Sequence, residues 1–230
     1  MLFDLHVHTK ESSPCGQIEA KELPGLYKEK GYDGIVITDH FVRSCMVNHY
    51  NLPYDDYCVL HKKGYEQAKE AGEKIGITVF YGIELRLDAT GNNDYLVYGM
   101  PNEFLLENKD IFTWSVSQLR EAADENGFVF YQAHPFRNTM NIVDPEFLFG
   151  VEVFNGKPYV RPIDSQRNEI ANLWAEKFSL HKIAGSDCHR ITQLATAGAK
   201  FACQIESEND FLDALKNDNY YLVERASKSI

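Results

Sequence analysis

The chain has 230 residues, of which 44% are hydrophobic and 25% are charged, a composition typical of globular proteins. Its 23 basic and 34 acidic side chains give a formal net charge of −11. This acidic balance disfavours nucleic acid and anionic lipid surfaces as partners, because both attract basic protein faces.

Short segments rich in β-branched and aromatic residues alternate with longer amphipathic segments, which predicts repeated βα units. In chain order, the predicted strands lie near Leu2–Val7, Gly34–Thr38, Thr78–Leu85, Tyr95–Met100, Phe128–Ala133, Val151–Phe154, Lys182–Ala184, Lys200–Ile205 and Tyr221–Glu224. The predicted helices are Tyr57–Ile75, Ser115–Asn126, Ile163–Phe178 and Asn209–Asn217. Ser115 and Gln118 have the spacing of a capping box, and Gly127 supplies a stop signal for the same helix.

Several predicted strands are apolar without alternation, for example Gly34-Ile-Val-Ile-Thr38. Such strands are expected where helices cover both faces of a sheet, so the pattern fits either a closed α/β barrel or a doubly wound sheet. We expect one domain over residues 1–230, because α/β barrels have about this length and no linker rich in Pro, Ser or Gly divides the chain.

The cellular compartment follows from two further features. No apolar run reaches the ~18 residues that span a bilayer, and the first residues lack a signal-peptide pattern, so we expect a cytoplasmic protein without membrane contact. The cysteines are odd in number and form no C-x-x-C pair, which indicates reduced thiols. They are Cys15, Cys45, Cys58, Cys188 and Cys203.

Potential metal ligands follow the ends of the predicted strands. They are His6, His8, His40, Glu84, His134, Asp187 and His189. The carboxyl ends of parallel barrel strands share one rim, so these side chains are expected to converge there. Each short motif alone also fits a polar turn at a strand end, but their joint placement favours metal binding.

The other histidines and the absence of several catalytic motifs limit the reaction classes that fit the sequence. His49, His61 and His181 have no ligand partners nearby and are interpreted as structural or surface histidines. The common signatures of serine hydrolases, P-loop proteins, dinucleotide-binding proteins and H-E-x-x-H metalloproteases are absent from the sequence. Metal chemistry is therefore the interpretation that remains.

Five motifs resemble, in order and spacing, those of the PHP (polymerase and histidinol phosphatase) family. They are Asp4-Leu-His-Val-His-Thr9, Ile37-Thr-Asp-His40, Gly82-Ile-Glu84, Ala133-His-Pro135 and Gly185-Ser-Asp-Cys-His189. The resemblance spans nearly the whole chain. It implies a distorted (β/α)7 barrel, two or three divalent metal ions (Zn²⁺, Mn²⁺ or Fe²⁺) at its C-terminal rim, and phosphoester hydrolysis.

The resemblance also implies a ligand set for the first two metals. It assigns one metal to His6, His8, Glu84 and Asp187. Glu84 bridges to a second metal, which His134 also holds. Relatives usually add a histidine to the second metal, and the residue most similarly placed here is Asp94. A carboxylate can replace imidazole on these ions, so Asp94 is a candidate ligand.

The third metal site departs from the family pattern. The resemblance assigns His40 and His189 to it, but residues 13–14 are Ser-Pro where relatives place a histidine or aspartate. Three alternatives remain for this site. It is completed by Cys15, Glu11 or the substrate phosphate, it is filled only transiently, or it is empty.

The implied mechanism uses a water held between two cations about 3.5–4 Å apart, which attacks phosphorus as hydroxide. Glu84 bridges the cations, Asp187 is a possible proton acceptor, and His189 or a third metal stabilises the leaving alkoxide. Arg43 and Arg137 follow ligand motifs and are candidates for binding substrate phosphate, although each also fits a solvated loop arginine.

The function that this pattern favours is hydrolysis of a small phosphorylated metabolite by a metal-dependent phosphomonoesterase. One alternative is a phosphodiesterase or nuclease on short oligonucleotides, which needs a basic or aromatic groove that the sequence does not indicate. The other is a non-catalytic metal-binding regulatory module, against which the nearly complete ligand set argues.

Overall fold

The computed structural model describes residues 1–156 and 162–224, and ten strands and six helices are named in these ranges. The strands are β1 (Leu2–Val7), β2 (Gly34–Ile37), β3 (His40–Phe41), β4 (Thr78–Arg86), β5 (Asp94–Tyr98), β6 (Val129–Gln132), β7 (Gly150–Asn155), β8 (His181–Gly185), β9 (Ala197–Phe201) and β10 (Tyr220–Glu224). The helices are α1 (Leu23–Glu29), α2 (Tyr54–Ile75), α3 (Asn102–Glu107), α4 (Val116–Asn126), α5 (Pro162–Phe178) and α6 (Glu208–Lys216).

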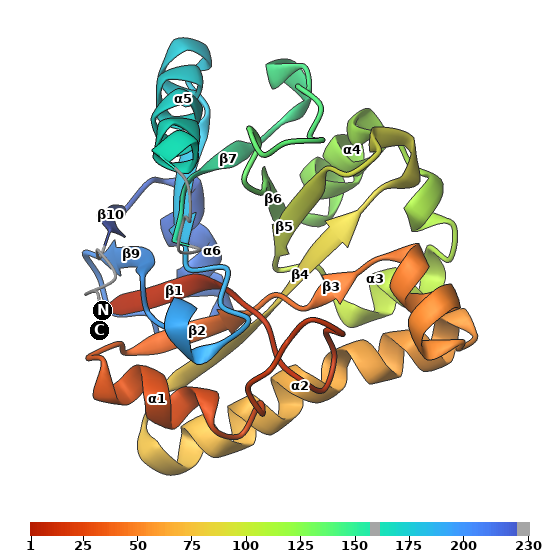
Figure 1. Cartoon of the computed structure of the whole chain (residues 1–230). Coiled ribbons are helices and arrows are strands. Elements are labelled where there is room, and N and C mark those ends of the chain that lie inside the picture. The colour runs from red at the N-terminus through yellow and green to blue at the C-terminus, as the bar shows by residue number, and fades with distance from the viewer. Residues whose placement is uncertain (157–161, 225–230) are drawn as a thin grey trace.

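The strands form one curved sheet in the order β10-β9-β1-β2-β4-β5-β6-β7-β8, and β3 pairs with the end of β4. The sheet curls back on itself (Figure 1), because the segment after β8 meets the end of β1. Cys188 N donates to His6 O at 3.2 Å, and His8 N donates to Cys188 O at 3.0 Å. The prediction of a distorted α/β barrel is confirmed, and the doubly wound sheet is excluded.

The strand directions correct one expectation. Parallel pairs join β1 to β2, β2 to β4, β6 to β7 and β7 to β8, but β5 is antiparallel to both of its neighbours. Only residues 87–93 connect β4 to β5, and a parallel crossover needs about a dozen residues or more. The chain therefore returns antiparallel, which brings the start of β5 to the rim where β4 ends.

The eighth predicted strand was placed too late in the chain. The sequence pattern predicted Lys200–Ile205, whereas β9 is Ala197–Phe201 and pairs antiparallel with β1 and β10. Its small residues allow a close approach that hydrophobicity does not indicate. A Cβ on Gly198 would lie 2.2 Å from the backbone oxygen of Phe3.

The four predicted helices are confirmed with small shifts at their ends: α2 begins at Tyr54 rather than Tyr57, α5 and α6 each begin one residue earlier than predicted, α4 begins one residue later, and α6 ends one residue earlier. The capping box of α4 is present, and Gly127 ends that helix with a φ of 78°. The short helices α1 and α3 were not predicted. Within the described ranges, no helix is both long enough and apolar enough to cross a lipid bilayer.

Aromatic side chains close the end of the barrel where β1 and β4 begin. Phe3 packs edge-on against Phe201, with ring centroids 5.5 Å apart, and Phe80 stacks on Phe211 of α6 at 5.2 Å. Burial of such side chains contributes roughly 1.5–3 kcal/mol each to the free energy of folding. On the outside, α1 and α2 lie side by side (Figure 1), with α1 packed against β2 and α2 packed against β4. The ligand-bearing polar side chains lie at the opposite end of the barrel, where β1 and β4 end.

Candidate metal centre

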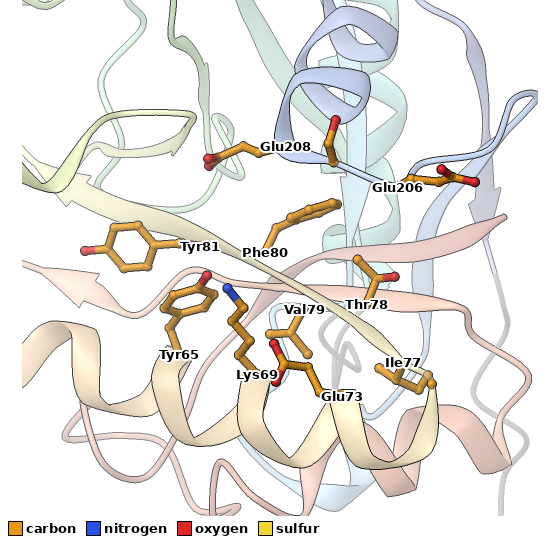
Figure 2. A pocket seen from close by; sticks show the side chains of 12 residues that line it. Tyr65, Lys69, Glu73, Ile77, Thr78, Val79, Phe80, Tyr81, Glu206 and Glu208 are labelled. Atoms are coloured by element: carbon orange, nitrogen blue, oxygen red, sulfur yellow. The ribbon is translucent and has the colours of Figure 1, made fainter.

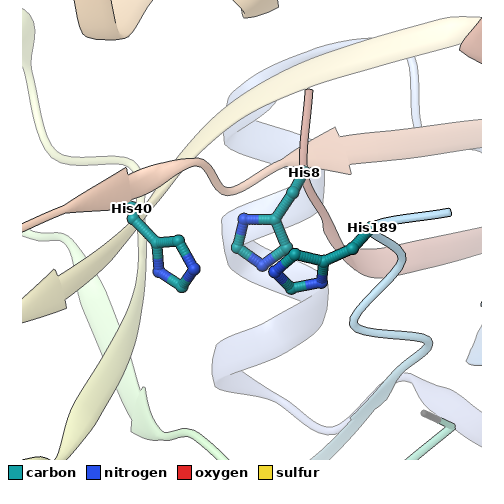
Figure 3. A group of neighbouring side chains, drawn as sticks. All are labelled: His8, His40 and His189. Carbon is teal, nitrogen blue, oxygen red and sulfur yellow. The ribbon is translucent and has the colours of Figure 1, made fainter. Parts of the chain in front are cut away.

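Three groups of ligand-bearing side chains converge at the rim where β1, β4, β6 and β8 end. The groups are His6, His8 and Asp187; His6, Glu84 and His134; and His8, His40 and His189. Within each group the ligand atoms lie within 4.8 Å of one another. Because the groups share members, they form one continuous cluster. Figure 3 shows the third group, in which three rings from separate segments turn toward one another.

Glu84 lies at the middle of this cluster and is fully buried. Its Oε1 is 3.4 Å from Nε2 of His6 and 3.1 Å from Nε2 of His134. Its Oε2 is 3.4 Å from Nε2 of His8 and 2.6 Å from Nδ1 of His40. Burial alone would raise the pKa of this carboxyl, but the His40 and His6 rings outweigh burial and hold that pKa well below its ordinary value. The carboxylate is therefore ionised, with each oxygen facing a different pair of rings.

Asp187 supplies the second carboxylate of the cluster. Its Oδ1 is 3.7 Å from Nε2 of His6 and 3.4 Å from Nε2 of His8, and its Oδ2 accepts a hydrogen bond from Arg137 at 2.5 Å. Burial would raise the pKa of Asp187, but the charges of Arg137 and His6 outweigh it and keep that pKa well below its ordinary value. Asp187 is thus an anion beside the two rings of the H-x-H motif.

The backbone around the ligands is held in uncommon conformations. His134 has a φ of 31° and Asp187 a φ of 52°, in the left-handed region that non-glycine residues rarely adopt. Hydrogen bonds fix both positions, because His134 N donates to Glu152 and the neighbouring Ser186 N donates to Asp4, each at 2.9 Å. Such strain is typical of functional sites, where the surrounding structure fixes the side-chain direction.

Hydrogen bonds at Nδ1 set the tautomers of two ligand candidates. Nδ1 of His6 lies 2.9 Å from Oε1 of Glu152, and Nδ1 of His189 lies 2.9 Å from the backbone oxygen of Asp187. A carboxylate or carbonyl oxygen only accepts, so each Nδ1 carries the proton and donates. In the neutral form of each ring, the lone pair is therefore on Nε2, the nitrogen available to a metal.

Ser13 occupies the place where the family pattern has a ligand, and it has a positioning role. Its hydroxyl donates to Oδ1 of Asp39 at 2.6 Å and accepts from the backbone N–H of His40 at 3.0 Å. The same oxygen lies 3.2 Å from Nδ1 of His8, which therefore donates to it and leaves Nε2 with the lone pair. Asp39 also accepts two hydrogen bonds from Thr9, so it orients the segment that follows the H-x-H motif.

The donor set fits divalent cations. Nε2 of His6 and Nε2 of His8 are buried, yet neither has a hydrogen-bond partner among the described residues. Buried polar atoms of this kind are rare, because each unmade hydrogen bond costs about 1–3 kcal/mol. Imidazole nitrogens and carboxylate oxygens are the ligands that Zn²⁺, Mn²⁺ and Fe²⁺ take in proteins. The cluster is therefore arranged to bind metal.

The structure does not bring Asp94 into any of the three groups. Both of its carboxylate oxygens accept from Arg86, at 2.7 and 2.8 Å, directly across the β4–β5 pair. Arg86 follows Glu84 by two residues on β4, so it occupies the next position outward on the same face. We therefore leave Asp94 out of the ligand set proposed below.

The two candidate arginines differ in position. Arg137 donates from Nη2 to Oδ1 of Asn155 at 2.7 Å as well as to Asp187, so its guanidinium lies directly beside the cluster. Arg43 instead pairs with Asp88 at 2.6 Å and lies over the ring of Phe112. Of the two, Arg137 alone contacts a member of the three ligand groups.

Glu152 is a functional residue that the sequence analysis missed. It lies on β7 with 1% of its surface exposed, and its two oxygens bind Nδ1 of His6 and the backbone N–H of His134. The available signal was a glutamate inside the apolar run Val151-Glu-Val153, since charged side chains are almost never fully buried unless they are paired.

The other histidines lie outside the three groups. His61 is buried between the backbone oxygen of Asp39, at 2.8 Å, and the Tyr81 hydroxyl, at 2.9 Å. His181 pairs with Asp218 and stacks on a phenylalanine ring, and His49 packs against Tyr50. The five cysteines all lie in the described ranges and are unpaired, as expected.

A separate hollow of about 510 Å³ lies between α2 and the start of α6 (Figure 2). It is lined by the first residues of β4 and by Lys69, Glu73, Glu206 and Glu208. Thr78, at its edge, precedes Glu84 by six residues, or about 20 Å of extended chain. None of the three ligand groups contributes to this hollow, so the metal centre is the stronger candidate site.

Comparison with known proteins gives one family match and several similar structures. The model of a PHP-associated family matches residues 165–220, and none of the curated proteins matches the chain. A two-domain protein from Bacteroides vulgatus, which contains a predicted PHP-like metal-dependent phosphoesterase, is 19% identical with a TM-score of 0.66. The likeness covers 98% of this chain and 65% of that protein, so the chain spans just under two thirds of its length.

Two further structures have the same fold. PsfC from Pseudomonas syringae is 16% identical, with a TM-score of 0.70 and coverage of 98% of this chain and 91% of its own. A proposed metal-dependent phosphoesterase from Bifidobacterium adolescentis is 18% identical, with a TM-score of 0.52 and coverage of 82% and 87%. At these identities the likenesses show the fold alone.

The fold and the three ligand groups define an α/β barrel with a candidate metal centre at one rim. The match over residues 165–220, together with this fold, supports a PHP-family protein. The resemblance that the five sequence motifs indicated is thereby confirmed.

Proposed function

We propose that this protein is a metal-dependent phosphoesterase that hydrolyses a small phosphomonoester. The observation that carries the proposal is the buried carboxylate of Glu84, which lies at the meeting point of four imidazole rings. Names of similar structures include metal-dependent phosphoesterases, which agrees with this chemistry.

The two oxygens of Glu84 serve different parts of the cluster. Oε1 faces His6 and His134, and Oε2 faces His8 and His40, so one carboxylate would hold two cations if one were bound on each side. Asp187 adds a second anion beside His6 and His8. When bound, a pair of divalent cations lowers the pKa of a water molecule and neutralises phosphoryl oxygens.

The chain's own residues supply orientation and charge. Glu152 and Ser13 hold His6 and His8 with Nε2 directed into the cluster, so the ligands need little reorganisation. Arg137 places a guanidinium next to Asp187, where it can donate to a nonbridging phosphate oxygen. His189, with its proton on Nδ1, presents the lone pair of Nε2 to the cluster, where it would hold a further cation that stabilises the leaving alkoxide.

The charge of the protein favours a small substrate over a nucleic acid. A net charge of −11 repels a polyanion, and oligonucleotide binding needs a row of cationic contacts along the strand. Of the two candidate arginines, only Arg137 contacts the cluster, whereas Arg43 is paired with Asp88. A single guanidinium beside the metal centre is enough to bind the one phosphate group of a small phosphomonoester.

Metal removal and resupply test this function. Chelator-treated protein is expected to release no phosphate from a panel of phosphomonoesters, and Mn²⁺, Zn²⁺ or Fe²⁺ added singly is expected to restore release from at least one of them. Phosphate release is measured alongside the metal content and the circular dichroism of each sample. Turnover of diesters or short oligonucleotides in preference to monoesters would point to a nuclease. No turnover by folded, metal-loaded protein with any substrate would contradict the proposal.

A further inference from the structure

Asn155, the last residue of β7, lies between the candidate phosphate-binding arginine and the ligand cluster. It is buried, with 1% of its surface exposed. Its Oδ1 accepts from Nη2 of Arg137 at 2.7 Å, and its Nδ2 donates to Oε2 of Glu152 at 2.9 Å. Arginine only donates and a carboxylate only accepts, so these two partners fix which end of the amide faces which neighbour.

Glu152 anchors the amide of Asn155 relative to the ligands. The same Oε2 of Glu152 accepts from the backbone N–H of His134 at 2.9 Å, and its Oε1 lies 2.9 Å from Nδ1 of His6. If Glu152 moved with the amide, it would lose its contacts with both ligand candidates. The side chain of Asn155 is therefore held at a fixed place beside the cluster.

Arg137 depends on this amide for its position. Its Nη2 donates to Asn155 and to Oδ2 of Asp187, at 2.7 and 2.5 Å. Because both contacts use Nη2, they leave Nε and Nη1 to donate to other acceptors, such as phosphate oxygens, and 23% of the side chain is exposed. Asp187 belongs to a ligand group, whereas Asn155 belongs to none of the three. Asn155 is thus the contact that Arg137 does not share with a metal.

We propose that Asn155 is a positioning residue that holds Arg137 in place for the phosphate group of the substrate. This inference rests on the proposed function, and it gives Asn155 no contact with the substrate itself. Arginine has a long, flexible side chain, and ordering such a side chain on binding costs free energy. A guanidinium that Asn155 fixes beforehand has less freedom to lose, so the phosphate binds more tightly.

The backbone of Asn155 is fixed independently of its side chain. Asn155 pairs with Gly185 of β8, and its backbone N–H donates to Oδ1 of Asn168 at 3.2 Å. Asn155→Ala is therefore expected to remove the two amide contacts without displacing the strand. Glu152 keeps its contacts with two ligand candidates in this variant, so the metal content is expected to stay near that of the wild type.

A double-mutant cycle with inorganic phosphate as the probe tests the proposal. Metal-loaded full-length protein is titrated with phosphate by calorimetry for the wild type, Asn155→Ala, Arg137→Ala and the double variant. Asn155→Ala is expected to weaken phosphate binding about tenfold in the wild type and to have little effect in the Arg137→Ala background. In hydrolysis, Asn155→Ala is expected to raise KM about tenfold and to change kcat less than about threefold.

Asn126→Ala is the matched control. Asn126 is exposed on α4, where its Nδ2 donates to the backbone oxygen of Ala122 at 2.9 Å, so its replacement is expected to leave phosphate affinity unchanged. Urea unfolding of each variant checks that the protein is folded under the conditions of the titration.

The outcomes separate the two proposals. An equal loss of phosphate affinity with and without Arg137 would show that Asn155 does not act through that residue and would overturn the inference. Wild-type affinity in folded, metal-loaded Asn155→Ala would overturn it as well, and in both cases the proposed function stands. If the folded, metal-loaded wild type neither binds phosphate nor hydrolyses any phosphomonoester, both proposals are wrong.

Discussion

Glu84→Gln is expected to lower phosphate release at least about a thousandfold and to reduce the metal content of the protein. The side chains have nearly the same size, so the change removes the negative charge and one acceptor oxygen without creating a cavity. Glu84 is buried among His6, His8, His40 and His134, and its anionic charge is what allows it to bridge cations. Phosphate release and metal analysis on the same preparation measure both effects.

Glu70→Gln is the matched control for this substitution. Glu70 is exposed on α2, where it pairs with Lys74 one turn away, and such surface pairs contribute little. Its replacement is expected to leave turnover and metal content unchanged. Near-normal hydrolysis by folded Glu84→Gln protein that retains its full metal content would refute the bridging role.

Gly185→Ala is expected to destabilise the protein by about 1–3 kcal/mol and to displace a ligand. A Cβ at this position would lie 2.3 Å from Cβ of His6 and 2.9 Å from its backbone nitrogen. Gly185 ends β8 where the barrel closes against β1, so the added methyl group forces apart the two strands that carry His6 and Asp187. Urea unfolding and metal titration are the measurements.

Gly25→Ala gives the corresponding control within α1. A Cβ there meets nothing within 4 Å, and alanine is favoured over glycine inside a helix by roughly 0.5–1 kcal/mol. This variant is expected to be as stable as the wild type or slightly more stable, with unchanged metal binding. Wild-type stability and metal affinity in Gly185→Ala would show that close packing at the barrel seam does not set the position of His6.

The convergence of the ligands was predictable from the sequence because it depends on strand ends. His6, His40, Glu84, His134 and Asp187 each come at or just after a strand, and barrel topology brings those ends to one rim. Periodicity located most of these strands, and the family resemblance that the five motifs carry implied a barrel rather than a doubly wound sheet. Neither inference required knowledge of any side-chain contact.

The partner of Asp94 was not predictable by the same reasoning. Its pairing with Arg86 depends on β5 returning antiparallel after a short connection, which places the two residues opposite each other in register. Sequence spacing alone placed Asp94 near Glu84. It did not indicate whether the Asp94 carboxylate binds a metal ion or pairs with an arginine. Arg43 is a similar case, since its contacts with Asp88 and Phe112 arise from loops far apart in the sequence.

Residues that position the ligands were also hidden from the sequence. Glu152 binds His6 across 146 positions of chain, and Ser13 acts on His8 and His40 through one hydroxyl. Such contacts depend on distances of about 3 Å between segments, which residue patterns do not specify. The sequence offered Cys15, Glu11 and the substrate phosphate to complete the third site, but it could not show that Glu11 is used elsewhere, where its Oε2 accepts from the backbone N–H of Ala20.

Anomalous X-ray diffraction from crystals of the manganese-loaded protein tests whether Glu84 joins two cations. Two anomalous peaks that share Glu84 are expected, one also bound by His6, His8 and Asp187 and the other also bound by His134. A single peak, or peaks that leave Glu84 without a metal, would contradict the bridging role of Glu84.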